Sequence, residues 1–137
     1  MNIYFACSIT GGREYQPVYH ALVESLLSAG HQVPTAHLAG PGVTSEALLA
    51  PRVVYERDTA WIRACDALVA EVSVPSHGVG YEIAFALEQG KPVLCLCRAG
   101  RPLSKMISGN PHSDLHVFVY EGLEQALNAV SSFLSHL

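Results

Sequence analysis

The chain has 137 residues, of which 50% are hydrophobic and 15% are charged. This composition is typical of one folded domain, residues 1–137, with a substantial core, and it excludes a disordered chain. The formal net charge is −4 and no run of Lys or Arg occurs, so nucleic-acid polymers are poor candidate partners. The charged fraction lies below the roughly 25% of ordinary domains, which indicates that another subunit covers part of the surface.

The chain carries no signal that would direct it to a membrane. Its first residues, Met1–Phe5, lack a basic region and a cleavage site, and no apolar stretch approaches the roughly 18 residues of a membrane span. We therefore expect a soluble cytoplasmic protein without a membrane partner, and leave nuclear entry open. The four cysteines show neither C-x-x-C spacing nor the density of a disulfide scaffold, so we expect reduced, buried thiols.

Short apolar runs alternate along the chain with longer amphipathic stretches, which predicts a parallel sheet covered by helices on both faces. The expected strands are 2–7, 31–36, 67–72, 92–97 and 116–120, and the expected helices are 13–29, 53–65, 81–89, 103–107 and 123–134. Pro34 favours a sheet edge for the second strand. The fold class is therefore α/β, a three-layer flavodoxin-like or Rossmann-like domain with a five-stranded parallel sheet.

In such sheets the ligand crevice lies beyond the carboxyl ends of the strands. The segment 73–80, rich in Gly and Pro, is expected to be an irregular turn between the third strand and a helix that begins at Tyr81. Free backbone N–H groups at that helix start could bind a phosphate. The alternative is that Gly78 and Gly80 only allow a tight connection, and neither a dinucleotide fingerprint nor a Walker A sequence is present.

Two carboxylates and one hydroxyl are candidates for chemistry. Glu82 lies in the first turn of its expected helix, where the macrodipole favours a charged nucleophile, although an ordinary helix-start glutamate is the simpler interpretation. Asp58 is equally well explained as a catalytic group or as a solvated charge. Tyr4 lies inside the first strand, where a tyrosine more often fills the core, yet its hydroxyl needs a partner.

Other polar segments offer weaker signals. The turn Ser8–Arg13 could bind a second anion, or it could be solvent-exposed loop. His37 and Trp61 offer flat faces for a base, but each alone is more often structural. The spacing of His112 and His116 would suit a metal only on a helix, which Pro111 argues against, so we predict no metal site.

Several motifs, taken in order, resemble the nucleoside 2-deoxyribosyltransferase family, and within it the 2'-deoxynucleoside 5'-phosphate N-hydrolases. They are 3–5, 11–14, 57–61, 66, 75–82 (Pro-Ser-His-Gly-Val-Gly-Tyr-Glu), 90–92 and 103–107 (Leu-Ser-Lys-Met-Ile). The resemblance covers nearly the whole chain. It implies that Glu82 is the nucleophile, that Asp58 assists departure of the base, and that Tyr4 orients Glu82.

The resemblance also implies a nucleotide substrate and a homodimer. Ser76 and Ser104 match serines that hold the 5'-phosphate, with Ser104 supplied by the partner subunit. A neutral Ser76 favours nucleotides, because the transferases tend to carry an acidic residue there. Thr10 stands where related hydrolases carry an arginine, a loss that Arg13 could offset. The predicted substrate-binding residues are Ser8, Ile9, Thr10, Gly11, Arg13, His37, Val54, Trp61, Ser76, Gly78, Gly80 and Ser104.

The leading hypothesis is hydrolysis of the N-glycosidic bond of 2'-deoxynucleoside 5'-monophosphates through a covalent glycosyl-enzyme intermediate, without a cofactor. Three alternatives stay open: exchange of bases by deoxyribosyl transfer, cleavage of ribonucleotides, and a nucleotide sensor without turnover. A sensor would be expected to lack a catalytic group, yet Tyr4, Asp58 and Glu82 are all present.

Overall fold

The computed structural model describes residues 1–9, 14–40 and 47–137, and its centre is a parallel sheet with the strand order β1-β2-β3-β4. The strands are β1 Ile3–Ala6, β2 Ala67–Glu71, β3 Val93–Arg98 and β4 Leu115–Tyr120. The helices are α1 Gln16–Ser28, η1 Ala36–Ala39, α2 Pro51–Ala64, α3 His77–Glu88, α4 Lys105–Ser108 and α5 Leu123–Ser135. The predicted α/β class with a parallel sheet is confirmed.

The predicted fifth strand, 31–36, is wrong for the described part of the chain. Only one bridge forms there, between Asn2 and Gln32. Its two hydrogen bonds run from Gln32 N–H to Met1 O (2.9 Å) and from Ile3 N–H to Gln32 O (2.8 Å). Pro34 has no N–H to continue the ladder, and η1 follows at once. The bridge nevertheless lies beside β1, where a flavodoxin-like sheet carries its second strand.

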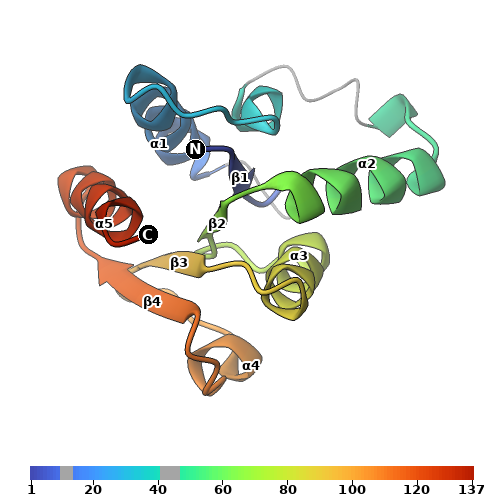
Figure 1. The fold of residues 1–137 in the computed structure, drawn as a ribbon. Helices are drawn as coiled ribbons and strands as arrows, with labels where there is room; N and C mark the ends of the chain where they lie inside the picture. The colour runs from blue at the N-terminus through green and yellow to red at the C-terminus, as the bar shows by residue number, and fades with distance from the viewer. Residues whose placement is uncertain (10–13, 41–46) are drawn as a thin grey trace.

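Alternation along the strands produces two cores, one on each side of the sheet. Ile3 and Phe5 pack with α1 and α5, while Tyr4 and Ala6 pack against α2 and α3. Figure 1 shows the same division, with α1 and α5 on one side of the sheet and α2 and α3 on the other. Because both faces are covered, β1 and β2 are buried along their whole length, as the continuous apolar runs predict.

Helix α3 begins one turn earlier than expected. Ser76 is its N-cap and accepts a hydrogen bond from Val79 N–H (3.4 Å), so the helix starts at His77 rather than at Tyr81. The expected irregular turn is therefore confirmed for residues 73–76 and wrong for residues 77–80. An N-cap stabilises a helix by about 1 kcal/mol, and a glycine destabilises it by a similar amount relative to alanine. The Ser76 cap therefore offsets the low helix propensity of Gly78.

The described helices are also short or polar relative to a bilayer. None of them is long and apolar enough to cross a membrane.

Candidate active site

The centre of the candidate site is a hydrogen bond between β1 and α3. Tyr4 projects from β1 toward the helices on its side of the sheet, and its hydroxyl donates to Glu82 Oε1 over 2.6 Å. The Tyr4 side chain is buried and Glu82 is half-buried. The predicted need of the Tyr4 hydroxyl for a partner is thus met by the carboxylate that the sequence singled out for chemistry.

Burial controls the protonation of this pair. Loss of water around the Glu82 carboxylate raises its pKa to about 7, an effect opposed by the hydrogen bond from Tyr4 and reinforced by the negative charge of Asp58. The pKa of Tyr4 is raised strongly, first by burial and then by the charge of Glu82, so the phenol remains a donor near neutral pH. Glu82 therefore changes charge close to neutrality while its partner does not.

Helix α2 brings Asp58 to the same place. Asp58 and Arg57 both influence the pKa of Glu82, and Arg57 Nε donates to Asp58 Oδ1 over 2.8 Å. Both of these side chains are largely shielded from solvent, with exposures of 20% for Arg57 and 15% for Asp58. The interpretation of Asp58 as a fully solvated surface charge is therefore wrong.

The flat side chains lie beside this charged group. The Arg57 guanidinium carbon stands 4.8 Å from the centre of the Trp61 ring, and Trp61 meets His37 edge to face with a centroid distance of 6.1 Å. Val54 is half-buried on α2, one turn before Asp58. The structure thus joins the residues predicted to surround a base into one region next to the carboxylates.

The N-terminus of α3 presents the second group of predicted residues. Neither Gly78 nor Gly80 has a positive φ, so backbone conformation does not require glycine at either position. A methyl group added at Gly80 would meet no atom within 4 Å, and one at Gly78 would meet only Ser76 Oγ at 3.8 Å. The tight-connection explanation therefore fails, and the glycines leave the backbone of this helix start open to a ligand.

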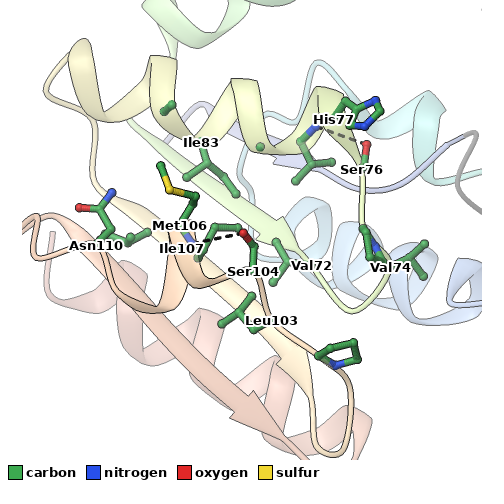
Figure 2. A pocket seen from close by; sticks show the side chains of 16 residues that line it. Val72, Val74, Ser76, His77, Ile83, Leu103, Ser104, Met106, Ile107 and Asn110 are labelled. Atoms are coloured by element: carbon green, nitrogen blue, oxygen red, sulfur yellow. Dashed lines mark hydrogen bonds between the residues drawn. The ribbon is translucent and has the colours of Figure 1, made fainter.

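Ser104 lies on a different side of α3 from Glu82. It is the N-cap of α4, its Oγ accepts from Met106 N–H (3.3 Å), and it is exposed. Figure 2 shows Ser104 and Ser76 at the wall of one groove of about 540 Å³ between α3 and α4. The groove is otherwise mainly apolar, lined by residues such as Val72 and Ile83, whereas Glu82 is not among its lining residues.

The turn after β1 is described only in part. Ser8 is fully buried, and its Oγ has no hydrogen-bond partner within the described residues, while Ile9 is half-buried. The predicted residues Thr10, Gly11 and Arg13 lie outside the described residues.

Two polar groups were missed by the sequence reasoning. Arg57 was included in the motif 57–61 but was given no role, although it contacts both Asp58 and Trp61. Glu71 was placed within a buried strand, and a carboxylate ending the run Ala-Leu-Val-Ala-Glu was the signal that could have singled it out. Across the described residues no three His, Cys, Asp or Glu side chains gather to hold a metal. The prediction of no metal site stays a prediction.

The geometry suits nucleophilic displacement at a carbon between two carboxylates. One carboxylate is held by a buried phenol and the other by a guanidinium. Glu82 also lies on the helix whose start is predicted to bind an anion. A pair of carboxylates with unequal surroundings is the arrangement by which glycosidic bonds are usually cleaved.

Comparison with known proteins agrees with this geometry. The family model described as "Nucleoside 2-deoxyribosyltransferase" matches residues 3–129, and the chain belongs to that family. A protein of Methanococcoides burtonii, named provisionally as a 2'-deoxynucleoside 5'-phosphate N-hydrolase, is 37% identical over 85% of this chain and 97% of its own. The 5-hydroxymethyl-dUMP N-hydrolase of Mus musculus is 46% identical over 79% of this chain and 65% of its own.

A solved structure shares the fold. The CMP N-glycosidase of Clostridium botulinum superposes with a TM-score of 0.70 over 96% of this chain and 99% of its own, at 21% sequence identity. This likeness concerns the fold, whereas the family model and the relatives confirm the family resemblance predicted from the sequence.

Helix α3 allows a test of its open glycine. We expect Gly80→Ala to raise the free energy of unfolding by about 0.5–1 kcal/mol, because alanine restricts the unfolded chain and meets no atom in the folded one. Gly30→Ala is the matched control and should destabilise, because Gly30 has a φ of +83°. Urea unfolding measures both. A stability loss in Gly80→Ala would contradict the view that this position is free of packing constraints.

Proposed function

We propose that the protein hydrolyses the N-glycosidic bond of 2'-deoxynucleoside 5'-monophosphates to a free base and 2-deoxyribose 5-phosphate. The observation that carries the proposal is the half-buried Glu82 carboxylate, bonded to Tyr4 and close to Asp58. Relatives with 36–46% identity that bear N-hydrolase names support the same activity.

In the proposed reaction, Glu82 attacks C1' of the sugar as the bond from C1' to the base nitrogen breaks. The base leaves with the bonding electron pair and takes a proton from Asp58 or from a water that Asp58 holds. Water then attacks C1' of the glycosyl ester and gives its proton to Asp58, while the bond from C1' to the Glu82 oxygen breaks and frees the Glu82 carboxylate. Two displacements retain configuration, and a 2'-deoxy sugar eases the positive charge that develops at C1'.

Tyr4 has a definite task in this scheme. The Tyr4 hydroxyl orients the Glu82 carboxylate, and its hydrogen bond favours the ionised form that acts as nucleophile. Because the phenol is buried in β1 and α3 rests on the same core, the carboxylate is held by two rigid elements. This reduces the reorganisation needed for attack.

The 5'-phosphate is assigned to the start of α3. Ser76 caps this helix without charge, and the neighbouring glycines leave backbone N–H groups approachable. A carboxylate at Ser76 would repel a phosphate. His37, Val54 and Trp61 are assigned to the base, since they gather on the α2 side of Glu82.

The proposed active unit is a homodimer in which Ser104 completes the site of the partner. Gly80 and Ile83 turn toward the groove that Ser104 lines, whereas Glu82 turns toward Tyr4. Within one chain α3 therefore stands between Ser104 and the nucleophile. A second copy supplying its own Ser104 from outside would avoid this obstacle, and an apolar groove of this kind is typical of a covered surface.

Substrate choice is tested with a panel of deoxynucleoside and ribonucleoside monophosphates and the plain nucleosides, with chromatographic detection of released base. We expect kcat/KM on the deoxynucleotides to exceed that on the nucleosides by at least about tenfold, since a phosphate interaction of about 1.4 kcal/mol gives that factor. With excess free base, 2-deoxyribose 5-phosphate should dominate over exchanged nucleotide. Efficient base exchange would instead favour a transferase, and binding without turnover would favour a sensor. Added chelator should leave the rate unchanged.

The nucleophile is tested through pH. Activity requires ionised Glu82, so log kcat/KM should rise with pH and level off above about 7, and Tyr4→Phe should move the midpoint upward because a hydrogen bond to the carboxylate is lost. Asp58→Asn is expected to lose about 10²–10⁴-fold in rate, more for poor leaving bases. Glu82→Gln should lose nearly all turnover while remaining folded.

A second readout of Glu82 is stability. Its folded pKa is raised from 4.5 to about 7, so the native protein binds this proton more tightly than the unfolded chain does. The contribution of the Glu82 carboxyl group to the free energy of unfolding is therefore most favourable below pH 4.5 and is lost as pH rises through about 7. Glu82→Gln should thus gain thermal stability relative to the wild type at pH 8. A folded, fully active Glu82→Gln variant would refute the assignment.

The shared site is tested by mixing two variants, one inactive and one with weakened use of the nucleotide, and comparing the mixture with each parent. Random pairing of Glu82→Ala with Ser104→Ala protomers creates heterodimers with one intact site, which should restore up to about one quarter of the wild-type activity. Glu82→Ala mixed with Asp58→Asn is the control and should recover none, because both residues belong to the same chain's site. A monomeric active enzyme, or verified heterodimers without recovery, would contradict the shared site.

A further inference from the structure

A second buried carboxylate lies across the sheet from Glu82. Glu71 ends β2 and is fully buried on the side that faces α1 and α5, whereas Tyr4 and Glu82 lie on the α2 and α3 side. Moving a carboxylate out of water costs several kcal/mol unless hydrogen-bond donors replace the solvent. The proposed reaction has no step for Glu71, so its partners must explain its presence.

Three donors converge on this carboxylate. The Ser73 hydroxyl and the Tyr120 hydroxyl (2.9 Å) both donate to Oε1, and the Ser73 N–H lies 3.3 Å from Oε2. Burial raises the pKa of Glu71, while the bonds from Ser73 and Tyr120 lower it. The carboxylate is therefore an acceptor for groups that come from strand β4 and from the connection after β2.

Ser73 links this carboxylate to the neighbouring connection. Its Oγ accepts the backbone N–H of Arg98 over 2.7 Å, which leaves the hydroxyl proton for Glu71. Its carbonyl accepts from Arg101 Nε over 3.3 Å. The chain between β2 and α3 is thus tied on one side to Glu71 and on the other to the chain that follows β3.

Arg101 extends the link to the start of α1. Its guanidinium carbon lies 5.6 Å from the centre of the Tyr15 ring, and its NH1 lies 3.7 Å from Glu14 Oε1. Arg101 stands three residues before Ser104, and Ser73 stands three residues before Ser76. Within one chain, the connections that carry Ser76 and Ser104 therefore meet at Ser73, although in the proposed dimer these two serines serve different sites.

We propose that Ser73, held by Glu71 and Arg101, is a positioning residue that places the Ser76 end of α3 for recognition of the 5'-phosphate. The inference rests on the proposed function and adds three positioning residues to it, Glu71, Ser73 and Arg101. Small displacements of an anion-binding helix start weaken its hydrogen bonds steeply, because these bonds depend on both distance and direction. Ser73 itself need not touch the substrate.

The first test is Ser73→Ala with Thr35→Val as the matched control. Both change a fully buried hydroxyl that accepts a backbone N–H, since Thr35 Oγ1 accepts from Phe5 N–H over 3.0 Å at the far side of the sheet. We expect Ser73→Ala to lower the ratio of kcat/KM on a deoxynucleotide to that on its nucleoside by about tenfold. Thr35→Val should lose comparable thermal stability and keep the ratio.

A binding measurement complements the kinetics and does not depend on turnover. Isothermal titration calorimetry with 2-deoxyribose 5-phosphate should give a Kd that is raised about tenfold in Ser73→Ala and unchanged in Thr35→Val. Glu71→Gln retains an acceptor oxygen for the two hydroxyls and should preserve most of the affinity, whereas Glu71→Leu should not.

Arg101 keeps the proposal testable if the buried variants fail to fold, because its side chain is 37% exposed. Arg101→Lys keeps the charge but loses the fork that reaches both Ser73 O and Glu14, so it should weaken phosphate recognition as much as Arg101→Met does. Full affinity in Arg101→Lys with loss only in Arg101→Met would assign a charge effect instead and overturn the positioning role.

The outcomes separate the two proposals. A wild-type enzyme that treats nucleotide and nucleoside equally would overturn the phosphate assignment and this inference with it. A wild-type preference that survives unchanged in Ser73→Ala and Arg101→Met would overturn the positioning role alone, with the proposed function intact.

Discussion

The parallel pairing of β1 with β2 is the constraint on which the rest of the structure depends. It places Tyr4 beside Leu68 in register and buries both strands completely, so every polar atom on them needs a partner from another element. For Tyr4 the partner is Glu82 on α3. Because the buried Tyr4 hydroxyl needs a hydrogen-bond acceptor, it holds the Glu82 carboxylate near the edge where ligands bind in such sheets.

The sheet carries a buried carboxylate on each side, and the two differ in what surrounds them. Burial raises the pKa of Glu82 to about 7, an effect that the hydrogen bond from Tyr4 opposes and the charge of Asp58 reinforces. Glu71 receives hydrogen bonds from Ser73 and Tyr120 and so has little capacity left for a substrate. Burial of the same functional group therefore supports a reactive role in one place and a structural one in the other.

The first turn of α3 gives up local stability without a compensating contact inside the chain. Gly78 and Gly80 lie in this helix without a positive φ, and a Cβ added at Gly80 would meet no close neighbour. Each glycine destabilises the helix by about 0.5–1 kcal/mol relative to alanine. Such departures from local preference are most often found at functional sites. Here the glycines lie between the capping serine and Glu82 along the chain, at the helix start to which we assign the 5'-phosphate.

The sequence by itself determined the layered α/β class, because alternating apolar runs and amphipathic stretches leave few other ways to bury both faces of a sheet. It also identified Tyr4, Asp58 and Glu82 as candidates and predicted the family. It did not determine the loss of a strand at Pro34 or the early start of α3 at Ser76. Both depend on local hydrogen bonds that compete on nearly equal terms and are decided by neighbouring elements.

Only the tertiary structure decided which polar groups meet. Tyr120 and Arg101 meet the pair Glu71 and Ser73 because β2, β4 and the connection after β3 converge at one edge, and no spacing in the sequence reveals that. The same holds for the separation of Ser104 from Glu82 by α3. Arg57 and Trp61, in contrast, are four residues apart on one helix, a spacing that predicts their contact. Periodicity reports which face of an element is buried, whereas long-range contacts depend on how those faces pack.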